Sequence, residues 1–255
     1  MKIPAVFLSH GAPTLAVDET PETHAWAALA AELPRPREIL AVSAHWDTDA
    51  PRVSTAAKPE TIHDFSGFAP ALYAQRYPAP GAASLAARVA KLLGAAGMEC
   101  STDAARGLDH GAWVPLKWMY PAADIPVTQL SVQSRRGARH HHEMGKVLAA
   151  LRDEGVLILA SGGIVHNLRE IQWRAQEPVA WAKSFNDWMA ARAQSGAIDE
   201  LLDYRARAPN AARSHPTDEH LEPFFVALGA AGLPARRLDL GFTYGSLGMD
   251  SYVFG

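Results

Sequence analysis

The stretch "EILAVSAHW", residues 38–46, decides the fold, because it has the pattern of a buried strand that stops at a histidine, His45. The same pattern occurs twice more, in "PAVFLSHGAP" (4–13), which leads to His10, and in "VLILASGGIVHNL" (156–168), which leads to His166. In an open α/β sheet, ligands collect at the carboxyl ends of the strands. Imidazole is the commonest metal ligand in proteins. The three apolar runs therefore predict a shared site at one edge of a sheet.

The rest of the chain alternates between apolar runs and helical patterns, which is typical of βα units. The expected strands are residues 3–9, 38–46, 125–133 and 156–163. The expected helices are residues 22–33, 81–97, 140–155, 177–196 and 220–232. Residues 63–80 are rich in Pro and Gly and contain four aromatic residues, so we expect a long ordered loop of functional importance. The alternation predicts an α/β protein with a single domain, residues 1–255, in which helices cover a central, largely parallel or mixed sheet.

Composition narrows the class of protein. The chain has 255 residues and a single cysteine, Cys100, so an intrachain disulfide is excluded and a reducing cytoplasm is the expected location. It has no signal-peptide pattern and no apolar window long enough to cross a membrane. The net charge is −3, with both signs interspersed, which argues against nucleic acid or a membrane surface as the partner. The oligomeric state is not fixed by the sequence.

Several histidines have neighbours that suit a site built from separated loops. Gly11 follows His10 and permits a tight turn after the strand. His110 lies in "GLDHGAW", again next to a glycine. The wide spacing of His10, His45, His110 and His166 does not fit a zinc finger. Histidine donors suit Zn²⁺, Fe²⁺ and other ions, so the residues alone leave the metal open.

The segment "SHPTDEHLEPFF" (214–225) offers two further histidines, His215 and His220. A helix over 220–232 would place His220 on an apolar face with Phe224 and Leu228, pointing inward. His215 precedes that helix, where we expect it in solvent. We also expect the run His140–His142 in solvent, because adjacent helical residues face different ways and cannot bind one ion together.

Taken in order, these motifs resemble the class III (LigB-like) extradiol ring-cleavage dioxygenases, in the branch of the 4,5-DOPA extradiol dioxygenases. The matching segments are "LSHGAP", "VSAHW", "TIHDFSGF", "YPAPG", "GLDHGAW", "MYPAADIPVTQLSV", "ALRDEGVLILASGGIVHNL" and "HPTDEHLEPFFVALGAA". They extend from residue 8 to about residue 231 and cover nearly the whole chain. As an ordered set they are specific, although each one alone is weak.

The resemblance implies a role for each matching histidine. His10 and His45 match the two N-terminal metal ligands, and His220 matches the downstream ligand. His166 matches a histidine at the metal, which is either a fourth ligand or the acid/base beside it. His110 matches a histidine of the substrate pocket. A histidine in the third ligand position is a departure from the two-His, one-carboxylate set of related enzymes.

The implied activity is cleavage of a catechol, such as DOPA or a related aromatic diol, by O₂ at an Fe(II) centre. Zn²⁺ can occupy such a site but has no redox chemistry. A histidine with a near-neutral pKa can both take and return a proton, a role for His166, with His110 as a hydrogen-bonding partner to the substrate or to dioxygen. The candidates for the wall around the aromatic ring are Trp46, His63, Phe65, Phe68 and Trp113. Two alternatives remain open from the sequence: a non-catalytic metal-binding interaction protein on the same fold, and a zinc-dependent hydrolase.

Overall fold

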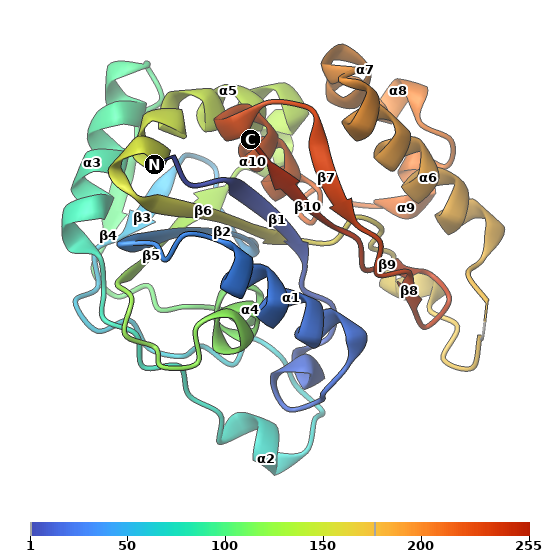
Figure 1. Cartoon of the computed structure of the whole chain (residues 1–255), viewed down its shortest axis with the longest axis horizontal. Coiled ribbons are helices and arrows are strands. Elements are labelled where there is room, and N and C mark those ends of the chain that lie inside the picture. Colours follow the sequence, from blue (N-terminus) through green and yellow to red (C-terminus); the bar gives the residue numbers. More distant parts are fainter. Residues whose placement is uncertain (1, 176) are drawn as a thin grey trace.

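An eight-stranded mixed sheet forms the centre of the molecule in a computed structural model that describes residues 2–175 and 177–255 (Figure 1). The strand order is β4-β3-β5-β2-β6-β1-β10-β7. The inner strands β5, β2, β6 and β1 pair in parallel, whereas β10 runs antiparallel to both β1 and β7. The strand bounds are β1 Ala5–Ser9, β2 Glu38–Asp47, β3 Arg52–Ser54, β4 Ser101–Asp103, β5 Val127–Val132, β6 Val156–Gly162, β7 Ala235–Leu238 and β10 Ser251–Phe254.

Both faces of the sheet are buried because successive side chains of a strand point to opposite faces and each face is covered by helices. In β1, Phe7 packs in one apolar cluster and its neighbours Val6 and Leu8 pack in the other. The helices on the Phe7 side are α3 (Ala83–Ala95), α5 (Gly137–Leu148), α6 (Ala180–Ser195) and α10 (Glu222–Ala231). Those on the opposite side are α1 (Pro21–Glu32) and α4 (His110–Met119). The expected α/β architecture is therefore confirmed.

The nine expected helices and strands are all present, with ends shifted by a few residues. The expected helix 140–155 divides into α5 and a 3-10 helix, Ala149–Glu154. Residues 63–80 form the expected long loop, interrupted by the short helix α2 (Pro70–Tyr73). Several short elements were not predicted, namely α7 (Ile198–Leu202), α8 (Tyr204–Arg207), α9 (Ala211–Ser214), β8 (Phe242–Thr243) and β9 (Leu247–Gly248), along with β3, β4, β7 and β10.

Helix α4 was also absent from the sequence prediction, because it contains a glycine and a proline near its start. Gly111 is its second residue and Pro115 its sixth, and both residue types disfavour a helix interior. The helix forms nonetheless because Asp109 caps it: the carboxylate accepts a hydrogen bond from the backbone N–H of Ala112 at 3.2 Å. Nearly all of its side chains are buried in the apolar cluster on that face of the sheet.

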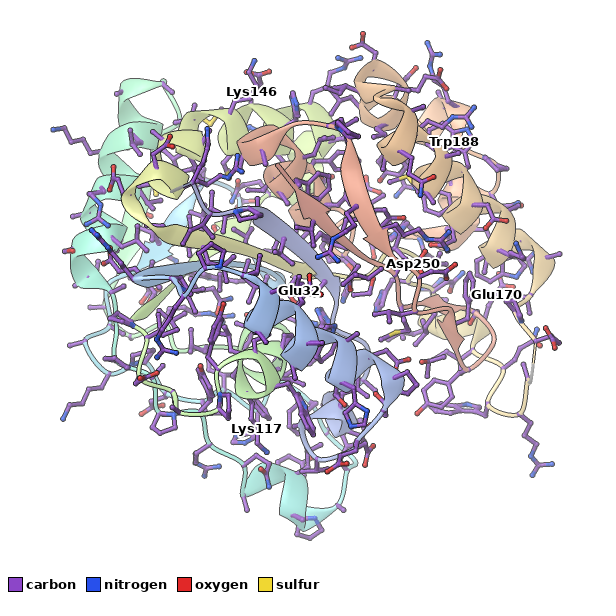
Figure 2. The ribbon with its side chains drawn as sticks, in the orientation of Figure 1. Glu32, Lys117, Lys146, Glu170, Trp188 and Asp250 are labelled. Atoms are coloured by element: carbon purple, nitrogen blue, oxygen red, sulfur yellow. The ribbon has the colours of Figure 1, made fainter. Side chains whose placement is uncertain are left out.

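This topology brings the carboxyl ends of β1, β2 and β6 to one edge of the sheet. His10 follows β1 directly, and His45 is the third residue from the end of β2. The chain that leaves β6 reaches His166 four residues later. Charged side chains such as Lys146 extend outward from the covering helices (Figure 2). No helix in the described part of the chain has the length and apolar character needed to cross a membrane.

Candidate active site

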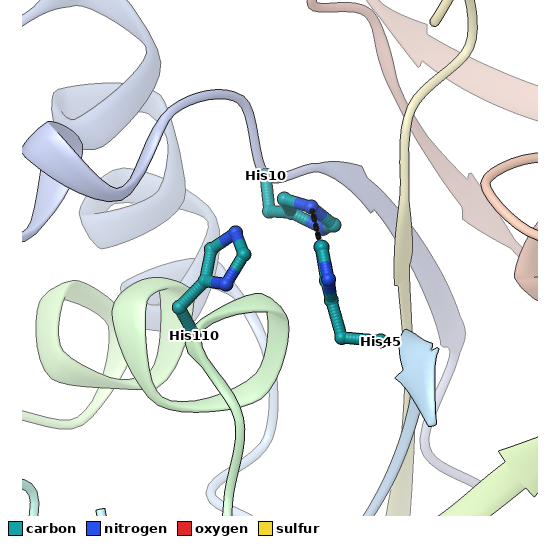
Figure 3. A group of neighbouring side chains, drawn as sticks. All are labelled: His10, His45 and His110. Carbon is teal, nitrogen blue, oxygen red and sulfur yellow. Dashed lines mark hydrogen bonds between the residues drawn. The ribbon is translucent and has the colours of Figure 1, made fainter. Parts of the chain in front are cut away.

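Three imidazoles meet at the carboxyl edge of the sheet (Figure 3). His10 comes from the end of β1, His45 from β2 and His110 from the first residue of α4. The Nε2 atoms of His10 and His45 lie 3.0 Å apart, and the ring centroids of His45 and His110 lie 4.0 Å apart. Imidazole nitrogens bind a metal at about 2.0–2.1 Å, so two ligands that meet near a right angle lie about 3 Å apart. The spacing of the two Nε2 atoms fits a shared metal ion.

The hydrogen bond made by Nδ1 determines which nitrogen of His10 can bind a metal. Nδ1 lies 3.0 Å from Oγ of Ser161, in β6. The single hydroxyl proton of Ser161 is donated to the carbonyl oxygen of Gly111, so Ser161 can only accept from His10. Nδ1 therefore carries the proton, and Nε2 presents its lone pair to the cavity.

Pro115 explains why the Gly111 carbonyl is available to Ser161. In an α-helix the carbonyl of residue 111 would accept from the N–H of residue 115, and proline has no N–H. Gly111 itself must lack a side chain. A Cβ there would lie 3.1 Å from Cδ2 of His45 and 3.2 Å from Cε1 of His10. The glycine and the proline that obscured the helix in the sequence thus let it support His10.

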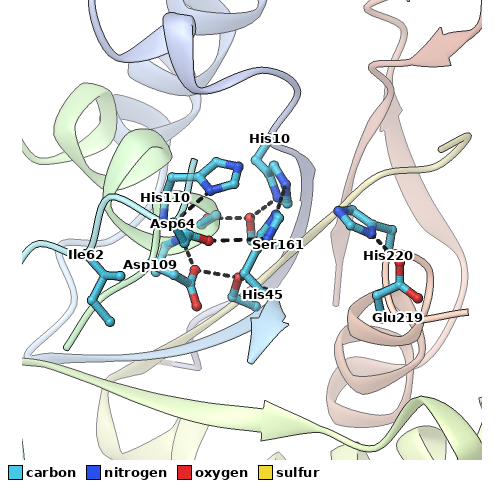
Figure 4. Close-up of polar contacts among 12 residues, drawn as sticks. His10, His45, Ile62, Asp64, Asp109, His110, Ser161, Glu219 and His220 are labelled. Carbon is cyan, nitrogen blue, oxygen red and sulfur yellow. Dashed lines mark hydrogen bonds and ion pairs between the residues drawn. The ribbon is translucent and has the colours of Figure 1, made fainter. Parts of the chain in front are cut away.

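Asp64, from the long loop, holds the other two rings of the cluster (Figure 4). Its Oδ2 lies 3.3 Å from Nδ1 of His45, and its Oδ1 lies 3.0 Å from Nδ1 of His110. Burial alone would raise the pKa of Asp64, but the hydrogen bond to His110 and the nearby imidazoles lower it to about 2. An ionised carboxylate accepts hydrogen bonds but donates none, so its 3.3 Å contact with His45 favours a proton on Nδ1. Asp64 was not among the predicted site residues, although the segment "TIHDFSGF" contains it.

His220 reaches the same cavity from the opposite side (Figure 4). Its ring centroid lies 5.5 Å from that of His10 and 5.0 Å from that of His45. The sequence argument for its direction was wrong, because α10 begins at Glu222 and His220 lies in the preceding turn. A neighbouring carboxylate orients it instead: Nδ1 donates to Oε1 of Glu219 at 2.9 Å. Nε2 is buried and has no hydrogen-bond partner among the described residues, which suits a metal ligand.

His166 stacks on His220, with ring centroids 3.4 Å apart and an angle of 8° between the ring planes. Nitrogen and oxygen atoms of His166, Glu219 and His220 all lie within 4.8 Å of one another, close enough for a shared ion. The structure therefore brings His166 to the site and is compatible with both roles expected of it.

Burial keeps these imidazoles neutral. Desolvation first, and then the neighbouring imidazoles, lower the pKa values of His10 and His220 well below 6.5. The same causes lower the pKa of His45 to about 4 and, with His215 as the main neighbour, that of His166 to about 3. A neutral imidazole is the form that binds metal, so these histidines could bind a metal ion at neutral pH.

A cavity of about 480 Å³ opens in front of the five histidines. Of the five residues expected to wall an aromatic ring, Phe65 and Phe68 line it. The other three pack elsewhere. Trp46 lies beneath the guanidinium of Arg106, Trp113 is buried and donates to the carbonyl of Ile62, and His63 donates to the carbonyl of Gln75. The cavity is completed by residues that sequence analysis missed, including Trp173, Tyr244 and Met249, which lie far apart along the chain.

Two histidines expected in solvent are buried. His215 is fully buried, and its Nε2 donates to the carbonyl of Ile164 at 3.0 Å. His141 is also fully buried: Nδ1 lies 2.7 Å from Oε2 of Glu222, and Nε2 accepts from the backbone N–H of Gln133. Both expectations failed because the partners lie on other elements. The prediction that His140–His142 do not share one ion stands untested.

Comparison with known proteins identifies the family. Residues 4–255 match the family model described as the catalytic LigB subunit of aromatic ring-opening dioxygenase. The chain belongs to this LigB family. It is 44% identical to a 4,5-DOPA dioxygenase extradiol of Beta vulgaris, with 97% of this chain and 95% of that protein covered. It is 42% identical to the protein of the same name from Escherichia coli (strain K12), with 100% and 95% covered.

A solved structure agrees with the LigB assignment. The crystal structure of an uncharacterized protein from Escherichia coli K12 superposes with a TM-score of 0.85, at 39% sequence identity, over the full length of both chains. LigB extradiol dioxygenases are metal-dependent oxidoreductases that open aromatic rings. The family, the fold and the enzyme class expected from the sequence are thus confirmed. Neither the interaction protein nor the zinc hydrolase gains support.

We predict that Ser161→Ala weakens metal binding about 10- to 100-fold, as is typical when the partner of a ligating histidine is lost. The change removes the acceptor that fixes the His10 ring and leaves the Gly111 carbonyl without its donor. Anaerobic competition against a chromophoric chelator gives the affinity, and circular dichroism checks the fold. Ser195→Ala, at the exposed end of α6, is the matched control and should bind as the wild type does. Equal affinities for all three proteins would contradict the role of Ser161.

A second prediction concerns acid stability. Burial lowers the pKa of His215 to about 4, whereas its value in an unfolded chain is 6.5. Above pH 6.5 the residue is neutral in both states and adds no pH dependence. Between pH 6.5 and 4 only the unfolded chain binds the proton, so stability falls as the pH falls, by up to about 1.4 kcal/mol per pH unit.

His215→Gln should therefore flatten the decrease in the free energy of unfolding of the metal-free protein below pH 6.5. Urea denaturation between pH 7 and pH 4.5 measures the slope. His24→Gln changes an exposed histidine and should leave the slope unaltered. If both variants have the wild-type slope, His215 does not contribute to acid unfolding as we describe.

Proposed function

We propose that this protein is an Fe(II)-dependent extradiol dioxygenase that cleaves a catechol ring with O₂. DOPA is the substrate that the names of its relatives suggest. His10, His45 and His220 would hold the metal. The observation that carries this proposal is that three neutral imidazoles from three separate segments turn Nε2 toward one cavity while an acceptor engages Nδ1.

Iron would supply the redox chemistry that couples the catechol to O₂, and would lower the pKa of the catechol hydroxyls. Zinc lacks that redox chemistry. An all-histidine set also adds no negative charge from the protein at the metal. The catechol and O₂ would supply the oxygen donors, which fits a cavity that opens directly in front of the imidazoles.

His166 would take a proton from a catechol hydroxyl and return it later in the reaction. Its imidazole is neutral, since burial and nearby histidines lower its pKa to about 3. A catecholate bound beside it would bring negative charge, which favours the protonated imidazole and raises that pKa toward the working range. If His166 served as a fourth ligand instead, it would be needed for metal binding.

His110 would position the substrate. Its Nδ1 is held by Asp64, and the residue lines the cavity, so its other ring nitrogen can hydrogen-bond to a substrate hydroxyl or to O₂. Phe65 and Phe68 form an apolar wall beside it, with ring centroids 5.5 Å apart. These rings would pack on the catechol and exclude water from it.

The direct test is reconstitution. The metal-free protein is loaded with Fe(II) without oxygen, and O₂ and a catechol are then added. We expect consumption of one O₂ for each ring opened and a yellow semialdehyde product. The zinc-loaded protein should bind metal but show no turnover. Stable iron binding with no oxygen uptake for any catechol tested would contradict the proposed activity.

Two variants separate the roles of the stacked histidines. His220→Ala should lose tightly bound metal, because it removes a ligand. His166→Ala should retain metal and lose about 10²- to 10⁴-fold in turnover, the usual contribution of a general acid/base. Elemental analysis and oxygen uptake give the two quantities, with His24→Ala as an exposed control. Loss of metal in His166→Ala would make His166 a ligand, and full activity would exclude both roles.

A further inference from the structure

Beyond the histidines, most side chains that line the cavity are apolar, and the polar ones among the described residues are Ser9, Thr14 and Asp64. Phe65, Phe68, Leu168, Ile171 and Trp173 line the cavity, together with Tyr244. At about 480 Å³ the cavity is larger than a single aromatic ring requires and lies within the usual range for small-molecule sites. With the two catechol hydroxyls at the metal, the remaining space receives whatever substituent the ring carries.

The mouth of the cavity exposes large apolar surfaces. Trp173 is 71% exposed and Leu168 is 59% exposed, two of the most exposed large apolar side chains in the described chain. Trp173 packs against Tyr244, with ring centroids 4.7 Å apart. The backbone holds this pair in place, because the N–H of Gln172 donates to the carbonyl of Tyr244 at 3.0 Å. Apolar side chains that are both exposed and held at a cavity mouth often mark a binding surface.

No lysine or arginine lines the cavity within residues 2–175 and 177–255. Two arginines directly follow cavity-lining residues in the sequence: Arg169 follows Leu168, and Arg174 follows Trp173. Both arginine side chains are exposed to solvent. Nε of Arg213 donates to Oε1 of Glu170 at 2.9 Å, and both side chains are partly exposed to solvent. Gln176 has an uncharged side chain. A substrate carboxylate would thus meet aromatic and aliphatic groups instead of a cation.

The cost of this mismatch is large for a charged substituent. Moving an ionised carboxylate or ammonium out of water is strongly unfavourable unless a partner group replaces the lost hydration. An alkyl or aryl substituent has the opposite effect, because it removes apolar surface from water on both partners. The wall therefore distinguishes ring substituents by their charge.

We propose that the preferred substrate is a catechol whose ring substituent is uncharged and apolar, and that Trp173, packed on Tyr244, is the residue that determines this preference. The inference rests on the proposed ring cleavage and narrows it: a zwitterionic amino-acid side chain, as in DOPA, is a poor fit for this wall. Trp173 is a specificity residue and takes no part in metal binding or proton transfer.

The test uses three catechols with the same ring and similar chains. These are 4-propylcatechol, 3-(3,4-dihydroxyphenyl)propionate and L-DOPA, which differ in the charge of the chain. For the iron-reconstituted protein, kcat/KM from oxygen uptake should be at least about 10-fold higher for 4-propylcatechol than for either charged compound. Trp173→Ala should bring the ratio close to one, mainly by lowering kcat/KM for 4-propylcatechol. An equal or higher kcat/KM for L-DOPA in the wild type overturns the inference.

The double change Arg169→Ala and Arg174→Ala tests whether these two arginines bind the carboxylate of a charged substrate. The substrate ratio should stay as in the wild type. A selective loss of more than 10-fold for L-DOPA would show that these arginines bind the carboxylate, and would also overturn the inference.

Binding without O₂ separates this inference from the proposed function. The fluorescence of Trp173, taken as the difference between the wild type and Trp173→Phe, is titrated with each catechol. We expect 4-propylcatechol to change it at a concentration at least about 10-fold lower than the charged compounds. If oxygen uptake is absent for all three catechols but this preference holds, the proposed function fails and the specificity of the cavity stands. If binding shows no preference, the specificity inference fails whatever the activity.

Discussion

The site depends on one contact made three times: an acceptor oxygen that lies against Nδ1 of a histidine that we propose as a metal ligand. The acceptors are Ser161 for His10, Asp64 for His45 and Glu219 for His220. Each contact favours a proton on Nδ1 and restrains the ring, which would leave Nε2 for the proposed metal. Without these contacts, imidazoles whose ring centroids lie 4.9 to 5.5 Å apart could rotate and pair with one another, and no common ligand position would be defined.

The sheet and one irregular helix position the first of these acceptors, Ser161. Ser161 lies in β6, directly between β1 and β2, so the same pairing that aligns the two strand ends also brings the hydroxyl to His10. Helix α4 holds that hydroxyl through Gly111, whose carbonyl lacks a helical partner because Pro115 has no N–H. Two residues that weaken the helix locally thereby take part in positioning His10, a proposed metal ligand.

The sequence predicted what depends on local pattern and missed what depends on distant partners. Apolar runs that end in a histidine were enough to place His10 and His45 at one edge of the sheet. The burial of His215 was not predictable, since its partner is the carbonyl of Ile164, some 50 residues away. The direction of His220 was predicted for the wrong reason, a helical face, when the carboxylate of the preceding residue orients it. The substrate wall is still harder to predict, because its residues come from loops with no periodic signal.

The most direct test of this account is a crystal structure of the iron-loaded protein, with the metal located by its anomalous scattering. The account predicts one iron within about 2.2 Å of the Nε2 atoms of His10, His45 and His220, with Nδ1 of each ring still on its oxygen acceptor. Iron bound through any Nδ1, or held by the Glu219 carboxylate in place of His220, would contradict it.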